Sequence, residues 1–106
     1  MVREVSPAEY LRESAAGPAR VLLDVREAWE REIAALPGAL HVPMAEIAAR
    51  LGEIDRSREI VVMCRSGGRS LKVARYLEEQ GYRSVANLTG GILAWARDVD
   101  PTLATY

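Results

Sequence analysis

The chain has 106 residues, of which 49% are hydrophobic and 27% are charged, and its formal net charge is −1. This composition is typical of a globular protein, so we expect residues 1–106 to form one domain that buries its own core. The nearly neutral charge argues against nucleic acid or an acidic membrane surface as a partner. A single cysteine excludes an internal disulfide and a multi-cysteine metal site, and nothing in the composition calls for a cofactor.

Three features of the sequence predict a cytoplasmic protein. Residues 1–7 lack the apolar core of a signal peptide. No apolar stretch approaches the roughly 20 residues that a membrane span needs. A lone free thiol also fits a reducing compartment better than a secreted one.

Strands and helices are predicted to alternate along the first half of the chain. Apolar runs bounded by turn or capping residues predict strands at residues 2–5, 20–25 and 39–42. Between the first two, the capping box Ser6-Pro7-Ala8-Glu9 starts a helix that we expect to reach Glu13. Asp24, together with Glu27, is a candidate cap for a second helix over residues 26–33.

The second half continues the alternation. Apolar residues at helical spacing predict a helix over residues 44–51, and strands and helices then follow at 60–63, 70–80, 84–88 and from 91 onward. Three other side chains are expected to pack in the interior, namely Trp29, His41 and Trp95, with a loop near the pocket rim as the alternative for Trp29. Short connections between alternating elements predict an α/β sandwich with a mostly parallel sheet of about five strands. Ligands of such folds bind at the carboxyl ends of the strands.

The segment that begins at Cys64 carries the chemistry. Cys64 follows a predicted buried strand and opens the loop Arg65-Ser66-Gly67-Gly68-Arg69-Ser70, which leads into a helix. Backbone N–H groups in such a loop, together with the positive end of the helix, favour an anion. We therefore predict that Cys64 ionises readily as a nucleophile and that the loop holds an anionic substrate over it.

The other residues of the loop have plausible roles in binding. Ser66 and Ser70 offer hydroxyl groups, and Gly67 and Gly68 allow backbone conformations that bulkier residues resist. Arg65 and Arg69 add positive charge for thiosulfate or phosphate, although a loop this short cannot aim both side chains inward. The only histidine, His41, lies on a predicted buried strand, which disfavours a Cys-His protease pair.

Four segments of the chain, in order, resemble the single-domain rhodaneses, a family of sulfurtransferases. These segments are Leu22-Leu23-Asp24-Val25-Arg26-Glu27, Leu36-Pro37-Gly38-Ala39-Leu40-His41-Val42-Pro43, the stretch from Val62 to Ser70, and Leu88-Thr89-Gly90-Gly91-Ile92-Leu93-Ala94-Trp95. The resemblance implies a rhodanese fold in which Cys64 takes a sulfane sulfur as a persulfide and passes it to a thiophilic acceptor. It also implies that the backbone of the 65–70 loop binds the anionic donor, and that Asp24 and Arg26 support the site.

The chain departs from the family pattern at one place. Many members have Gly-His before the Pro-Gly-Ala stretch, where this chain has Ala34-Ala35, so a histidine contribution is absent there. This variant, with the tail from Asp100, looks similar to rhodanese domains attached to sulfur-carrier-activating enzymes. The resemblance implies a small anionic sulfur donor and an acceptor that is cyanide, a thiol or a protein of a sulfur-carrier pathway.

Two other functions compete with sulfur transfer. Related cysteine phosphatases and arsenate reductases use a Cys-x5-Arg loop, whereas here the arginine comes one position earlier, at Arg69. The shorter loop favours a sulfur atom on the thiol over an enclosed phosphate. Non-catalytic rhodanese-like binding modules often lack the cysteine, which this chain keeps.

Overall fold

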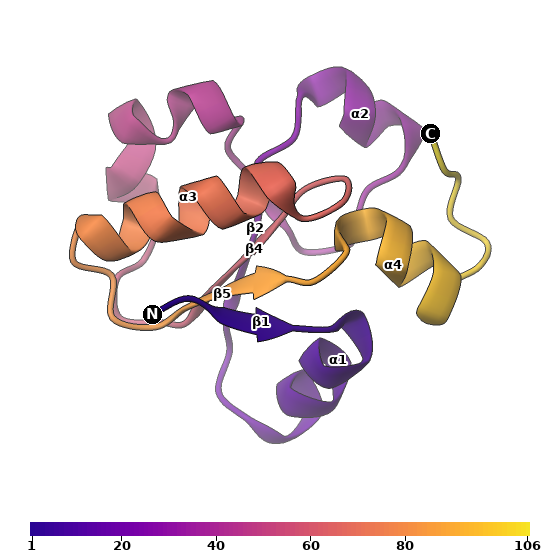
Figure 1. Ribbon diagram of the computed structural model, residues 1–106, viewed down its shortest axis with the longest axis horizontal. Helices are drawn as coiled ribbons and strands as arrows, with labels where there is room; N and C mark the ends of the chain where they lie inside the picture. The colour runs from indigo at the N-terminus through magenta and orange to yellow at the C-terminus, as the bar shows by residue number, and fades with distance from the viewer.

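The computed structural model describes all 106 residues and is built around a five-stranded parallel sheet with helices on both faces (Figure 1). The strands, in chain order, are β1 (Arg3–Val5), β2 (Val21–Asp24), β3 (Leu40–His41), β4 (Ile60–Met63) and β5 (Val85–Leu88). They lie in the order β1-β5-β4-β2-β3, and every neighbouring pair is parallel. This confirms the predicted α/β sandwich.

Four α-helices and two 3-10 segments surround the sheet. They are α1 (Pro7–Ala16), α2 (Ala28–Ile33), η1 (Met44–Glu46), η2 (Ala48–Glu53), α3 (Gly68–Glu79) and α4 (Gly91–Asp98). Figure 1 shows α3 and the 3-10 segments on one side of the sheet and α1 with α4 on the other. None of the helices is long and apolar enough to cross a membrane.

The core is divided by the sheet into two apolar clusters. Successive side chains of a strand point to opposite faces, so Ile60 and Val62 of β4 join the cluster under α3, and Val61 and Met63 join the cluster under α4. All four are fully buried. The continuous apolar run of β4 is thus explained by a central strand that is covered on both faces.

The predicted helix over residues 44–51 is wrong. The segment forms two short 3-10 pieces, and Arg50 breaks the helical geometry with φ −117° and ψ 20°. Of the expected apolar face only Ile47 is fully buried, while Met44 and Ala48 are exposed. With one buried anchor, tertiary packing does not hold a full α-helix in this connection.

Three predicted interior side chains have different outcomes. Trp95 lies in the core, as predicted. Trp29 is 58% exposed and forms an edge-to-face pair with Tyr106, with ring centroids 5.9 Å apart, so the expected interior packing is wrong. His41 is half-buried rather than in the core, and its Nε2 lies 2.6 Å from the carbonyl oxygen of Arg26.

A buried ion pair lies at the carboxyl end of β2. The Arg26 side chain is fully buried and donates from Nε and Nη2 to the two carboxylate oxygens of Asp24, at 3.0 and 2.8 Å. The predicted capping role of Asp24 is therefore wrong. Glu27 takes the N-cap position, and its N–H donates to the Glu30 carboxylate at 2.8 Å.

We predict that Arg26→Met destabilises the protein by about 3–5 kcal/mol, because it leaves the Asp24 carboxylate buried with its main partner removed. Urea unfolding measures the loss. Arg97→Met is the matched control, since the Arg97 side chain is 72% exposed and pairs only with its neighbour Asp98. The control is expected to change stability by less than about 0.5 kcal/mol. Equal stability of the two variants would contradict this assignment.

Candidate active site

The candidate site lies at the carboxyl edge of the sheet. Cys64 comes directly after β4, the central strand, and the loop to α3 begins there. Asp24 ends β2, the neighbour of β4 on one side, and Leu88 ends β5, the neighbour on the other. The crossover connections therefore bring three chain segments to one edge around a single thiol.

The loop after Cys64 curls around its sulfur. The N–H of Gly67 donates to Cys64 Sγ at 3.1 Å, and the Ser70 hydroxyl oxygen lies 3.3 Å from the same sulfur. Gly67 is the N-cap residue of α3 and has a φ of +108°, a left-handed conformation that favours glycine. This turn aims backbone N–H groups of the loop and of the first turn of α3 at the sulfur.

The environment of the thiol favours its ionised form. Burial raises the pKa of Cys64, but the Ser70 hydroxyl and the backbone N–H groups of Ser70, Gly67 and Ser66 outweigh it, so the pKa lies below its usual value. Ionised sulfur therefore needs no histidine beside it. Cys64 is only 1% exposed, so the loop and the residues around it close the sulfur off from solvent.

The start of α4 holds the loop from behind. The N–H groups of Ile92 and Leu93 donate to the carbonyl oxygens of Cys64 and Arg65, at 3.0 and 3.1 Å. Gly91 makes this approach possible: a Cβ at that position would lie 2.5 Å from both carbonyl oxygens. The contact leaves the opposite, N–H side of the loop free to face the sulfur.

Arg69 is held by an acidic partner from α2. Its guanidinium donates to both carboxylate oxygens of Glu30, at 2.8 and 2.7 Å. The hydrogen bonds from Arg69 lower the pKa of Glu30 to about 2, against the opposing effect of burial. The positive charge next to Cys64 is therefore already paired, and an anionic donor that binds Arg69 has to compete with Glu30.

Arg65 points to the C-terminal segment. Its guanidinium donates to the main-chain oxygen of Tyr106, with Nε at 2.6 Å, and lies over the Tyr106 ring. The Tyr106 hydroxyl donates to Glu30 at 2.8 Å and accepts from Arg26 at 3.0 Å. Asp24 and Arg26, expected as supporting residues, are thus linked through Tyr106 and Glu30 to Arg69.

Three residues of this arrangement were missed at the level of sequence: Glu30, Asn87 and Tyr106. Asn87 is a polar residue inside the otherwise apolar strand β5, and this contrast was the only feature of the sequence that indicated a special role for it. It is 3% exposed and accepts a hydrogen bond from the Ser70 hydroxyl at 2.5 Å. Glu30 and Tyr106 gave no such signal, because a helix surface and a tail are ordinary places for them.

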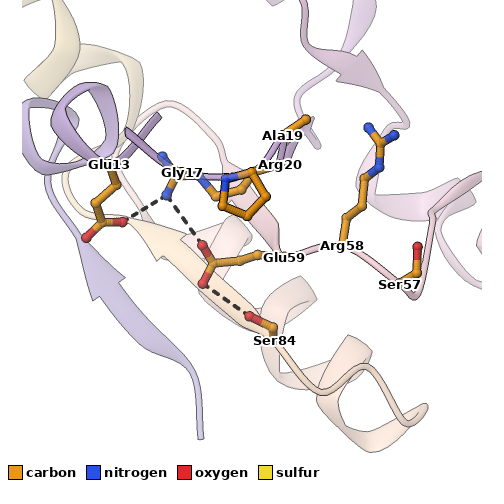
Figure 2. A pocket seen from close by; sticks show the side chains of 9 residues that line it. Glu13, Gly17, Ala19, Arg20, Ser57, Arg58, Glu59 and Ser84 are labelled. Atoms are coloured by element: carbon orange, nitrogen blue, oxygen red, sulfur yellow. Dashed lines mark hydrogen bonds and ion pairs between the residues drawn. The ribbon is translucent and has the colours of Figure 1, made fainter. Parts of the chain in front are cut away.

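A separate surface pocket of about 660 Å³ lies away from Cys64 (Figure 2). Its lining residues come from α1 and from the segments that precede β2, β4 and β5, so it opens at the amino edge of the sheet. In Figure 2, Arg20 reaches between Glu13 and Glu59, and Glu59 also contacts Ser84. These charges pair with one another, and the pocket lies at the opposite edge from the thiol.

We predict that Gly91→Ala destabilises the protein by about 2 kcal/mol or more, because the new methyl group collides with backbone and the φ of +61° disfavours alanine. Gly68→Ala is the matched control, since its Cβ meets nothing within 4 Å and helical Gly→Ala changes are neutral or stabilising. Urea unfolding of both variants checks the prediction. A Gly91→Ala protein as stable as wild type would show that the close contact of α4 is not needed.

The lowered pKa of Cys64 predicts a pH-dependent contribution to stability. Ionisation favours the folded state, so the contribution is complete above the unfolded pKa of about 8.5 and is lost as pH falls through the lower folded value. Wild type should therefore gain stability relative to Cys64→Ser as pH rises through this window. The His41→Ala protein should show the same gain in stability relative to the double variant His41→Ala/Cys64→Ser. Unfolding curves across the window measure it, and a difference that stays flat would contradict the lowered pKa.

The chain is similar to known proteins along nearly its whole length. Residues 6–98 match the family described as Rhodanese-like domain. A sulfurtransferase of Allochromatium vinosum is 44% identical, covering 98% of this chain and 97% of that protein. An adenylyltransferase and sulfurtransferase of Arabidopsis thaliana is 33% identical over 81% of this chain, which corresponds to 22% of that longer protein.

Solved structures agree with the fold. The crystal structure of a rhodanese-like domain protein from Staphylococcus aureus superposes with a TM-score of 0.84 and 27% identity, covering 99% of each chain. The family match extends over β2 to β5, the Cys64 loop and α4, and the structural likeness covers nearly the whole chain. The chain therefore belongs to the rhodanese-like domain family.

Proposed function

We propose that this protein is a sulfurtransferase that carries a sulfane sulfur on Cys64 as a persulfide. The observation that supports it most is the single thiol at the end of β4, which hydrogen-bond donors surround and whose pKa lies below the usual value. A nucleophilic cysteine of this kind needs an ionised sulfur and nearby groups that stabilise the negative charge during the reaction. The loop supplies both with backbone groups.

The proposed reaction has two steps. With thiosulfate as donor, the Cys64 thiolate attacks the outer sulfur, a new S–S bond forms, and the S–S bond of thiosulfate breaks as sulfite leaves with its electron pair. The negative charge now lies on the terminal sulfur of the persulfide. In the second step a nucleophilic acceptor attacks that sulfur, and the Cys64 thiolate leaves. A persulfide donor follows the same course and releases a thiol.

The 65–70 loop is the proposed binding site for the donor and for the persulfide charge. The N–H groups of Ser66, Gly67 and Ser70 face the sulfur, and Gly68 opens α3 behind them. Arg65 and Arg69 serve a donor only when it displaces Tyr106 or Glu30. A thiol that is 1% exposed favours small donors, such as thiosulfate or a low-molecular-weight persulfide.

The proposed acceptor is a thiophilic molecule: cyanide in an assay, and a thiol or a protein of a sulfur-carrier pathway in the cell. The 33% identity to part of an adenylyltransferase and sulfurtransferase supports the carrier pathway, because the same domain type occurs there beside an adenylylating activity. The proposed location is the cytoplasm.

We predict that the protein gains one sulfur atom on incubation with thiosulfate, and that Cys64→Ser does not, because the chain has no second thiol. Intact mass spectrometry measures the addition, and cyanide should remove it as thiocyanate. Ser57→Ala, at the opposite edge of the sheet, is the matched control and should gain the sulfur like wild type. Thiocyanate release from Cys64→Ser, or hydrolysis of an aryl phosphate that depends on Cys64, would overturn the proposal.

A further inference from the structure

Asn87 is a buried polar side chain for which packing alone gives no reason. It lies on β5 between apolar neighbours, is 3% exposed, and forms hydrogen bonds with three residues of two other segments: Glu4 of β1, and Gly67 and Ser70 of the loop after Cys64. A buried amide is tolerated only when its donors and its acceptor are satisfied. The hydrogen bonds of Asn87 therefore define the orientation of its side-chain amide.

The orientation of the Asn87 amide is fixed by two acceptors. Nδ2 donates to the Glu4 carboxylate at 3.2 Å and to the carbonyl oxygen of Gly67 at 3.2 Å. Neither a carboxylate nor a carbonyl oxygen can donate, so the amide nitrogen has to face both of them. The amide oxygen, Oδ1, is left facing Ser70.

This orientation decides where the proton of Ser70 goes. While the thiol is neutral, the Ser70 hydroxyl donates its one proton to Asn87 Oδ1 at 2.5 Å. Its oxygen then presents a lone pair to Cys64 Sγ, 3.3 Å away, where it can accept the proton of a neutral thiol. To stabilise the thiolate, the hydroxyl must instead turn its proton to sulfur and leave Oδ1 of Asn87 buried without a donor.

We propose that Asn87 is a positioning residue that competes with the Cys64 thiolate for the single proton of the Ser70 hydroxyl. The inference rests on the proposed role of Cys64 as the nucleophile. Competition leaves the resting thiolate less stabilised than the loop alone would make it, and a less stabilised thiolate is the stronger nucleophile. Once Sγ is bonded to a second sulfur it carries no charge, and the hydroxyl can stay on Asn87 without loss.

Other charged groups near the thiol are accounted for. Arg69 on α3 interacts with the charge of Cys64 and is paired with Glu30 of α2, whose pKa is about 2. The pKa of Arg69 is raised above its usual range, so this pair stays ionised throughout the titration of the thiol. On the other side, the Glu4 carboxylate of β1 lies beyond Asn87 and meets its Nδ2.

The test is a double-mutant cycle on the pKa of Cys64, measured from the pH dependence of its alkylation by iodoacetamide. The four proteins are wild type, Ser70→Ala, Asn87→Leu and the double variant. Asn87→Leu should lower the pKa by about one unit more when Ser70 is present than when it is replaced, because only then is a proton released to the sulfur. Any effect of Asn87 on the loop through Gly67 occurs in both backgrounds and cancels.

The proposal would be overturned if Asn87→Leu shifted the pKa of Cys64 equally with and without Ser70. It would also be overturned if Asn87→Leu raised that pKa when Ser70 is present. If Asn87→Leu does not fold, Asn87→Ala takes its place in the same cycle. In wild type, the side-chain amide signal of Asn87 in NMR spectra should shift with the midpoint of Cys64 ionisation, and Ser70→Ala should abolish that shift. Alkylation needs no sulfur donor, so these results stand apart from whether the protein transfers sulfur.

Discussion

The site depends on one close backbone contact, where the start of α4 meets the carbonyl oxygens of Cys64 and Arg65. The N–H groups of Ile92 and Leu93 satisfy these carbonyls, and Gly91 removes the side chain that would block the approach. With its carbonyl groups bound on one side, the loop presents its N–H groups on the other. The polarity around the sulfur thus follows from the packing of two helix starts, α3 in front and α4 behind, on neighbouring strands of a parallel sheet.

The charged side chains form a second layer that acts on the loop indirectly. Asp24, Arg26, Tyr106, Glu30 and Arg69 are joined in one hydrogen-bonded chain from the end of β2 to the first turn of α3. This chain neutralises Arg69, so ionisation of Cys64 depends mainly on the Ser70 hydroxyl and on the backbone N–H groups of Ser70, Gly67 and Ser66. Under the proposed function, a donor anion meets the loop N–H groups first and reaches Arg69 only by displacing Glu30.

The parts of the fold that the sequence predicts are those with a local cause. The apolar run before Cys64 and the glycines at 67, 90 and 91 indicated the strand, the turn and the final helix, which the structure confirms. Residues 44–51 were misjudged because helical spacing does not reveal that, of the expected apolar face, only Ile47 is fully buried. The roles of Asn87 and Tyr106 arise from contacts with residues distant in sequence, such as Glu4 and Arg26, and no local pattern encodes such contacts.

The central claim is that backbone N–H groups, rather than a histidine or a free arginine, hold the negative charge at Cys64. A crystal structure of the protein after exposure to thiosulfate tests it most directly. The account predicts a terminal persulfide sulfur within hydrogen-bond distance of the loop N–H groups, with the pair of Arg69 and Glu30 intact. A terminal sulfur turned out of the loop and bound by an arginine released from its partner would contradict it.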